Sequence, residues 1–136
     1  ETWNFEHGEV FDESVEDKLI ESLKPDYVEG ITLLGGDPME EENQSVLLPF
    51  LRKIRQRYPD KKTIWAYTGY VLDVDLVPGG RKFTIDTDEL LSYLDVLVDG
   101  PFILEQKNIA LKFRGSANQR IIDMREYRNT GSIVVL

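Results

Sequence analysis

Gly30-Ile31-Thr32-Leu33-Leu34-Gly35-Gly36-Asp37-Pro38 is a short apolar run that ends in two glycines, an acid and a proline. A partly β-branched run of this length, bounded by turn residues, is typical of a strand buried on both faces. We therefore predict a central strand over residues 30–34. The residues that follow can form a strand-to-helix turn, with Asp37 as the N-cap, Pro38 as the first helical residue and Glu40 closing a capping box.

Two more strands are predicted further along the chain. Residues 63–67 are β-branched and aromatic, and residues 95–99 hold an apolar run between two aspartates. Both are followed by turn-forming residues, as expected for strands. In the last third of the chain, the strongest strand candidates are residues 121–122 and 132–136.

Helical spacing of apolar residues fills the gaps between these strands. It predicts three helices: residues 14–23, the residues after Asn43 up to Tyr58, and residues 86–94. Ser14 and Asp86 are expected to cap the first and third helices, and Pro49 to kink or restart the second. Because strands alternate with helices, we expect right-handed parallel βαβ units in one α/β domain spanning residues 1–136.

The chain is acidic, with 16 Lys and Arg against 25 Asp and Glu and a formal net charge of -9. The acids concentrate between Glu1 and Glu42. A negative protein repels phosphate backbones, so nucleic-acid binding is disfavoured as the main function. The one dense basic run interleaves with apolar residues at helical spacing, and we interpret it as the solvated face of a helix. It consists of Arg52, Lys53, Arg55, Arg57, Lys61 and Lys62.

The chain contains no cysteine, which excludes disulfides and thiolate metal ligands within these 136 residues. The single histidine, His7, lacks the spaced partners of a closed metal site, so no metal ligand is predicted. No apolar stretch approaches the roughly 20 residues that span a bilayer, and no signal peptide is visible. We therefore expect a cytoplasmic protein that does not contact a membrane.

The most promising chemistry lies where the predicted strands end, because ligands of parallel α/β sheets bind beyond the carboxyl ends of the strands. Those ends are residues 35–38, 68–70 and 99–101, and each holds a glycine that lets the backbone approach a ligand closely. Structural interpretations remain open: a capped turn, an acid bonded to its own turn, or core packing of Tyr67 and Tyr70. No G-x-S-x-G, Walker A or G-x-G-x-x-G sequence is present, which argues against hydrolase, NTPase and dinucleotide-binding functions.

Four blocks, taken together and in order, resemble one family. They read Leu33-Leu34-Gly35-Gly36-Asp37-Pro38, Trp65-Ala66-Tyr67-Thr68-Gly69-Tyr70, Val98-Asp99-Gly100-Pro101-Phe102 and Arg114-Gly115-Ser116-Ala117-Asn118-Gln119-Arg120-Ile121-Ile122-Asp123. This set is similar to the activating proteins of anaerobic ribonucleoside-triphosphate reductase, which are radical S-adenosylmethionine (SAM) enzymes. The second and fourth blocks are the most specific.

The resemblance implies a partial parallel (β/α) barrel of the radical SAM type, with a [4Fe-4S] cluster on a Cys-x3-Cys-x2-Cys loop. It implies an oxidoreductase, served by an electron donor such as a flavodoxin, that reductively cleaves SAM and generates a glycyl radical on anaerobic ribonucleoside-triphosphate reductase. An activase of another glycyl-radical enzyme, such as pyruvate formate-lyase, is an alternative that the later blocks disfavour.

The resemblance also implies site residues, position by position. The family's glycine-rich element for the methionyl ammonium of SAM corresponds to Gly35, Gly36, Asp37 and Pro38. Thr68 and Gly69 are expected near the ribose or methionyl part, and Asp99 is expected to line the same pocket. Asn118 and Arg120 are assigned only to a pocket wall or a partner contact.

The chain departs from the family in its missing cysteines. In the family, the cysteine loop is closely followed by a segment that Thr2-Trp3 resembles. We therefore expect the first strand and the cluster loop to precede Glu1, and this chain to be the C-terminal body of the activase, inactive alone and without a catalytic residue. Two other hypotheses are a non-catalytic module that binds SAM or a nucleotide, and a partner-docking domain.

Overall fold

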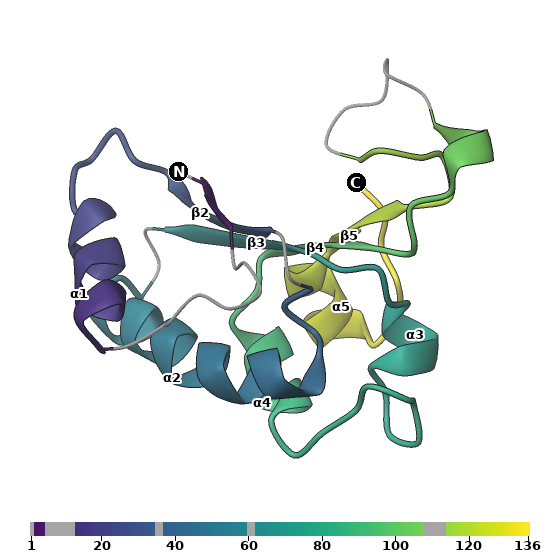
Figure 1. Ribbon diagram of the computed structural model, residues 1–136, viewed down its shortest axis with the longest axis horizontal. Coiled ribbons are helices and arrows are strands. Elements are labelled where there is room, and N and C mark those ends of the chain that lie inside the picture. The colour runs from purple at the N-terminus through teal and green to yellow at the C-terminus, as the bar shows by residue number, and fades with distance from the viewer. Residues whose placement is uncertain (1, 5–12, 35–36, 60–61, 108–113) are drawn as a thin grey trace.

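The structure, a computed structural model, describes residues 2–4, 13–34, 37–59, 62–107 and 114–136. It consists of one sheet whose strands are connected mostly by helices (Figure 1). The elements are β1 (Thr2–Asn4), α1 (Glu13–Ser22), β2 (Gly30–Leu34), α2 (Glu41–Arg57), β3 (Thr63–Tyr67), α3 (Leu72–Asp75), α4 (Thr87–Ser92), β4 (Val96–Asp99), the 3-10 helix η1 (Leu104–Gln106), β5 (Arg120–Asp123) and α5 (Met124–Thr130).

The sheet has five strands in the order β1-β2-β3-β4-β5. The first four are parallel, and β5 runs antiparallel to β4. Ile31 pairs with Ile64, Ala66 with Leu97, and Leu97 with Ile122. This architecture confirms the predicted α/β class and the strands at residues 30–34, 63–67 and 95–99. Strand β1 was not predicted from the sequence, and a further strand before Glu1 stays a prediction.

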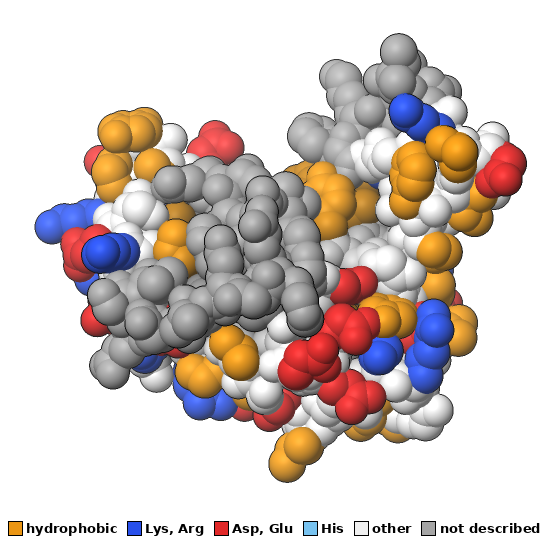
Figure 2. All heavy atoms as spheres, viewed as in Figure 1, with side chains coloured by type: hydrophobic (Ala, Val, Ile, Leu, Met, Phe, Trp, Pro, Cys, Tyr) orange, Lys and Arg blue, Asp and Glu red, His pale blue; other side chains and the backbone are white. Residues whose placement is uncertain are grey.

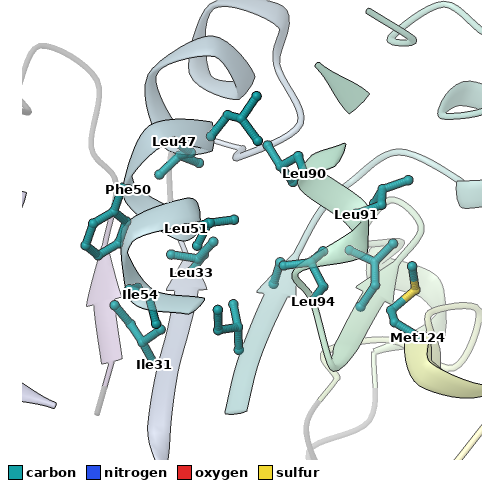
Figure 3. Packing of buried hydrophobic residues seen from close by; sticks show 14 of the residues in the cluster. Ile31, Leu33, Leu47, Phe50, Leu51, Ile54, Leu90, Leu91, Leu94 and Met124 are labelled. Carbon is teal, nitrogen blue, oxygen red and sulfur yellow. The ribbon is translucent and has the colours of Figure 1, made fainter. Parts of the chain in front are cut away.

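Helices α1, α2, α4 and α5 lie along one side of the sheet (Figure 1). From α2, the side chains of Phe50, Leu51 and Ile54 pack toward Ile31 and Leu33 of β2 (Figure 3). All five are at most 3% exposed, and burying a side chain of this size stabilises a fold by roughly 1.5–3 kcal/mol. This packing holds α2 against β2.

The core continues beneath β4, where α4 meets α5. Leu90, Leu91 and Leu94 of this region belong to the same buried cluster as Met124, the first residue of α5 (Figure 3). Strand β4 is buried at every position, whereas β3 alternates between buried and half-buried residues. The half-buried positions include Trp65 and Tyr67, on the face of β3 opposite Ile64 and Ala66. The sheet therefore has one helix-covered face and one more open face.

Several predicted helix ends were wrong. Ser14 lies inside α1, which begins at Glu13. Helix α2 begins at Glu41, before the predicted start after Asn43. Asp86 is the N-cap of α4, as predicted, although neither its side chain nor that of Glu40, the N-cap of α2, makes a capping bond. Pro49 lies within α2, which runs as one helix from Glu41 to Arg57 with no restart.

The last predicted strand was also wrong. Residues 132–136 form no strand, and only Val135 makes a single bridge, to Ile122. The prediction for residues 121–122 is confirmed, because both lie in β5. Residues 134–136 thus contact β5 through this bridge and two backbone hydrogen bonds, from the Asp123 N–H to the Val134 carbonyl and from the Leu136 N–H to the Ile121 carbonyl, without forming a strand.

The basic run is not a uniformly solvated face. Lys62 is 6% exposed, and its ammonium donates to the carbonyls of Pro25 and Val28 at 3.0 and 2.5 Å. Arg55 keeps a side-chain exposure of only 17%. Arg52 and Arg57 do lie toward solvent, with 45% and 41% of the side chain exposed.

Within the part of the chain that the structure describes, no helix is long and apolar enough to cross a membrane.

Candidate functional site

The carboxylate of Asp37 joins the carboxyl ends of β2 and β3. Its Oδ1 accepts hydrogen bonds from the Thr68 hydroxyl at 2.7 Å and from the Met39 N–H at 3.0 Å. Its Oδ2 accepts from the Gly69 N–H at 2.8 Å. Three donors from two chain segments therefore hold both oxygens of one acid, an arrangement that we call the Asp37 knot.

This arrangement corrects the role predicted for Asp37 as the N-cap of the following helix. Helix α2 starts four residues later, at Glu41. The Asp37 carbonyl accepts from the Glu40 N–H at 3.0 Å and from the Asn43 side-chain amide at 2.9 Å. Pro38 is buried beside it. Asp37 thus organises the turn between β2 and α2 and ties this turn to β3.

Of the predicted site residues, the structure brings Asp37, Thr68 and Gly69 into direct contact. Thr68 is 4% exposed, whereas Gly69 lies at the surface. A Cβ added at Gly69 would lie 3.5 Å from the Asp37 carboxylate, an ordinary contact distance. Gly35 and Gly36 lie outside the described residues, in the chain leading directly to Asp37.

Asp99 forms a separate cluster at the end of β4. It is fully buried and accepts from Arg120 Nε at 2.9 Å, from Arg120 Nη2 at 2.6 Å and from the Leu72 N–H at 2.8 Å. Arg120 Nη2 also donates to Asp73 at 2.9 Å. The hydrogen bond with Asp99 raises the pKa of Arg120, and the bond with Asp73 adds to it while burial opposes both.

The strand ends carrying these two clusters are linked by backbone hydrogen bonds. The Thr68 N–H donates to the Val98 carbonyl at 2.9 Å, and the Gly100 N–H donates to the Tyr70 carbonyl at 2.8 Å. Gly100 has a φ of 103°, which L side chains rarely adopt. The glycine therefore lets the chain turn sharply after β4 while the ends of β3 and β4 stay together.

The polar segment from Arg114 to Arg120 hydrogen-bonds to this turn. Asn118 donates to the Pro101 carbonyl at 2.7 Å, and Gln119 donates to the Gly100 carbonyl at 3.0 Å. The Gln119 side-chain oxygen accepts from the N–H groups of Gly115 and Ser116 at 2.8 and 3.1 Å. The side chains of Asn118 and Arg120 therefore both hydrogen-bond to other residues of this chain. The sequence had placed them only at a pocket wall or a partner contact.

A charged cluster that was not predicted from the sequence borders the Asp37 knot. The Tyr70 hydroxyl donates to Glu40, and Lys82 Nζ lies 3.4 Å from the same carboxylate. The hydrogen bond from Tyr70 lowers the pKa of Glu40, although burial opposes it, and the same bond raises the pKa of Tyr70. The Arg81 guanidinium stacks 4.8 Å from the centre of the Tyr70 ring.

The surface near this cluster is mainly acidic. The first turn of α2 carries Glu41 and Glu42, and acidic side chains gather over the start of this helix (Figure 2). Lysine and arginine side chains adjoin them (Figure 2). No single residue in the sequence marks this cluster, because its members come from three separate segments.

Comparison with known families matches residues 1–122 to the 4Fe-4S single cluster domain. Three curated relatives carry the name anaerobic ribonucleoside-triphosphate reductase-activating protein. The one from Haemophilus influenzae is 41% identical over 122 residues, covering 88% of this chain and 73% of the relative. Those from Vibrio cholerae and Escherichia coli K12 are 40% and 33% identical, covering 88% and 91% of this chain and 73% and 76% of the relatives. No solved structure matches the chain.

The residues present do not fit the cluster that this family model names. The chain has no cysteine, and its described residues contain no group of three or more His, Cys, Asp or Glu side chains arranged to hold a metal ion. The relationship nevertheless extends over most of the sequence and includes the Asp37 knot and the loop around Asn118. The chain therefore belongs to the family of anaerobic ribonucleoside-triphosphate reductase-activating proteins.

Proposed function

We propose that this chain binds SAM at the carboxyl ends of β2 and β3, as the body of an activase for anaerobic ribonucleoside-triphosphate reductase. The observation that carries the proposal is the Asp37 knot, in which one carboxylate fixes Thr68, Gly69 and the turn that follows Gly36. The reductase as partner rests on the name that the relatives share.

The chemistry of SAM suits this position. Its methionyl ammonium needs acceptors, which the backbone carbonyls of a double glycine can offer without side-chain obstruction. Its sulfonium and ammonium are cationic, and both the net charge of -9 and the acids at the start of α2 favour approach of a cation. In this proposal Gly35 and Gly36 hold the ammonium, Thr68 and Gly69 border the ribose or methionyl part, and the Asp99 region closes the same pocket.

The sheet supports the finer fold assignment, a partial barrel of the radical SAM type. The four parallel strands follow one another in sequential order, and α1, α2 and α4 lie on one side (Figure 1). A doubly wound sheet would instead reverse its strand order at a switch point. An open, more exposed inner face, such as the one bearing Trp65 and Tyr67, is what a partial barrel offers to a ligand.

The share of this chain in the radical chemistry is to bind and orient SAM. The chain contains no thiolate that could hold an iron-sulfur cluster. The oxidoreductase activity and the flavodoxin-type electron donor are therefore proposed for a protein that carries the cluster. The absence of cysteine favours one second candidate, a non-catalytic module that binds SAM or a nucleotide.

Titration calorimetry of the purified chain with SAM tests the proposal. We expect saturable binding that Asp37→Asn weakens at least tenfold, because the amide cannot accept from all three donors. Asp26→Asn, at an exposed position on another loop, is the matched control and should bind like the parent chain. Absence of binding would leave a partner-docking domain as the better account. Nucleotide binding that Asp37→Asn weakens would favour the second candidate.

A further inference from the structure

A hollow lies at the end of the sheet where the chain enters β4, opposite the Asp37 knot. It has a volume of about 490 Å³, and its polar lining includes Arg55, Tyr93, Asp95, Arg125, Arg128 and Asn129. Asp95 immediately precedes β4, whereas the Asp37 knot lies beyond the carboxyl ends of β2 and β3. The two places are therefore separated by the length of the sheet.

Positive charge is concentrated in this hollow. Arg55, Arg125 and Arg128 surround the single carboxylate of Asp95, which gives a local excess of positive charge in a chain whose net charge is -9. Arg55 Nη2 and Arg125 Nε each donate to Asp95 at 2.7 Å, and the Ile64 N–H donates to it at 2.7 Å. Asp95 is therefore held by the backbone of β3 and in turn positions the guanidinium groups of Arg55 and Arg125.

Four of the five N–H groups of Arg55 donate to the protein. Its Nε and Nη2 donate to the Tyr93 carbonyl at 3.2 and 2.6 Å, and its Nη1 donates to the Lys62 carbonyl at 2.6 Å. Together with the bond to Asp95, these contacts lock the side chain in place. Arg55 thus contributes charge and rigidity, with most of its donors already used within the protein.

Arg125 and Arg128 keep donors available. Arg125 bonds Asp95 only through Nε, and its side chain is 60% exposed. Arg128 uses Nη1 for the carbonyls of Leu91 and Leu94, at 3.2 and 2.7 Å. Within the described part of the chain, the Nη atoms of Arg125 and the Nε and Nη2 atoms of Arg128 make no hydrogen bond. Each residue therefore presents unused N–H groups at the hollow.

The guanidinium groups of this cluster also repel one another. Burial is the main cause that lowers the pKa of Arg128; the charges of Arg55 and Arg125 lower it further, while the carboxylates of Asp95 and Asp123 oppose them. An anion that binds here would offset this repulsion and accept the unused hydrogen bonds. The free donors and the repulsion thus point to the same class of ligand.

We propose that this hollow is a binding site for a small molecule bearing a phosphate group. Arg125 and Arg128 contact the phosphate oxygens, and Asp95 and Arg55 position them. Planar guanidinium groups match phosphate oxygens in pairs, and the volume lies within the range of roughly 300–1,000 Å³ that small-molecule sites occupy. The rings of Tyr93 and Pro59 also line the hollow and offer flat surfaces to the rest of the ligand.

Titration calorimetry at constant ionic strength tests the site with inorganic phosphate, pyrophosphate and ATP. We expect saturable binding of pyrophosphate or ATP, weakened about tenfold by Arg125→Gln or Arg128→Gln, since each removes charged donors. Arg52→Gln changes the net charge equally at an exposed helix position paired with Glu89, and should leave binding unchanged. Tighter binding of ATP than of pyrophosphate would indicate that the rings of Tyr93 and Pro59 contact the nucleoside part.

Folding is monitored in parallel by circular dichroism. Arg128 donates to carbonyls at the end of α4 and just after it, so Arg128→Gln could unfold the chain. In that case the test rests on the Arg125→Gln variant, because Arg125 is exposed. Three results would overturn the proposal: no binding of any phosphate at millimolar concentration, equal weakening by Arg52→Gln and Arg125→Gln, or tighter binding of a hexaglutamate peptide than of pyrophosphate.

Discussion

Asp37 accepts the hydroxyl hydrogen bond of Thr68 at 2.7 Å, across 31 residues of sequence. This contact links the turn after β2 to the end of β3, at the edge where parallel strands expose their carboxyl ends. Gly69, next to Thr68, donates to the other carboxylate oxygen. One acid therefore helps to set the position of the turn after β2 relative to the end of β3.

Replacing Asp37 with asparagine should loosen this knot. The amide retains one acceptor oxygen and presents an NH2 group toward a donor, so at least one of the three hydrogen bonds is lost. We expect the free energy of unfolding to fall by about 1–3 kcal/mol. Urea denaturation measures the change, with Asp26→Asn as the exposed control. Equal stability of both variants would contradict the structural role of Asp37.

The buried pair of Asp99 and Arg120 should be far less tolerant. Arg120→Ala leaves the Asp99 carboxylate buried with its Leu72 contact alone among those described, and we expect a loss of about 3–5 kcal/mol. Adding Asp99→Asn removes the stranded charge and should recover part of the loss. Arg52→Ala, in an exposed pair with Glu89, is the control and should lower the free energy of unfolding far less than Arg120→Ala, because solvent screens an exposed pair. Similar losses at both arginines would show that the buried pair has no special role.

Glu40 should contribute to stability in a pH-dependent way. Its folded pKa is lowered by the Tyr70 hydrogen bond, so the contribution is present above its ordinary pKa of 4.5 and is lost as the pH falls through the folded value. Tyr70→Phe removes the donor and should shrink this acid-dependent loss. Urea midpoints measured from neutral pH downward check it, with Tyr27→Phe at an exposed position as the control. Parallel pH curves for Tyr70→Phe and the parent chain would contradict the prediction.

The central strands could be predicted from the sequence because their signal is local. Residues 30–34, 63–67 and 95–99 are apolar runs bounded by turn residues, and such runs have few alternatives in an α/β chain. Strand β1 has only three residues, too few to produce a pattern. Helix starts were less predictable from the sequence: Ser14 matches a capping preference, yet α1 already begins at Glu13, whereas Asp86 is the N-cap of α4, as predicted, without a side-chain capping bond.

The site was predicted as a set of strand ends, and its internal contacts were not. Parallel topology alone brings Asp37 and Thr68 to one edge, and this was expected. The pairing of Asp99 with Arg120 and of Tyr70 with Glu40 depends on long-range packing that has no local signal. The same holds for Arg55, which reads as part of a solvated helix face yet contacts the start of β4 through Asp95.

The most direct test of the central claim is a 15N NMR titration of the chain with SAM. We predict saturable shifts of the Thr68 and Gly69 amides, while the amides near Asp95, at the other end of the sheet, stay unchanged. Gly36→Val should abolish these shifts, because a branched side chain blocks approach of the ligand to the backbone. Shifts that are absent at millimolar SAM, that centre on Arg125, or that persist in Gly36→Val would contradict SAM binding at the ends of β2 and β3.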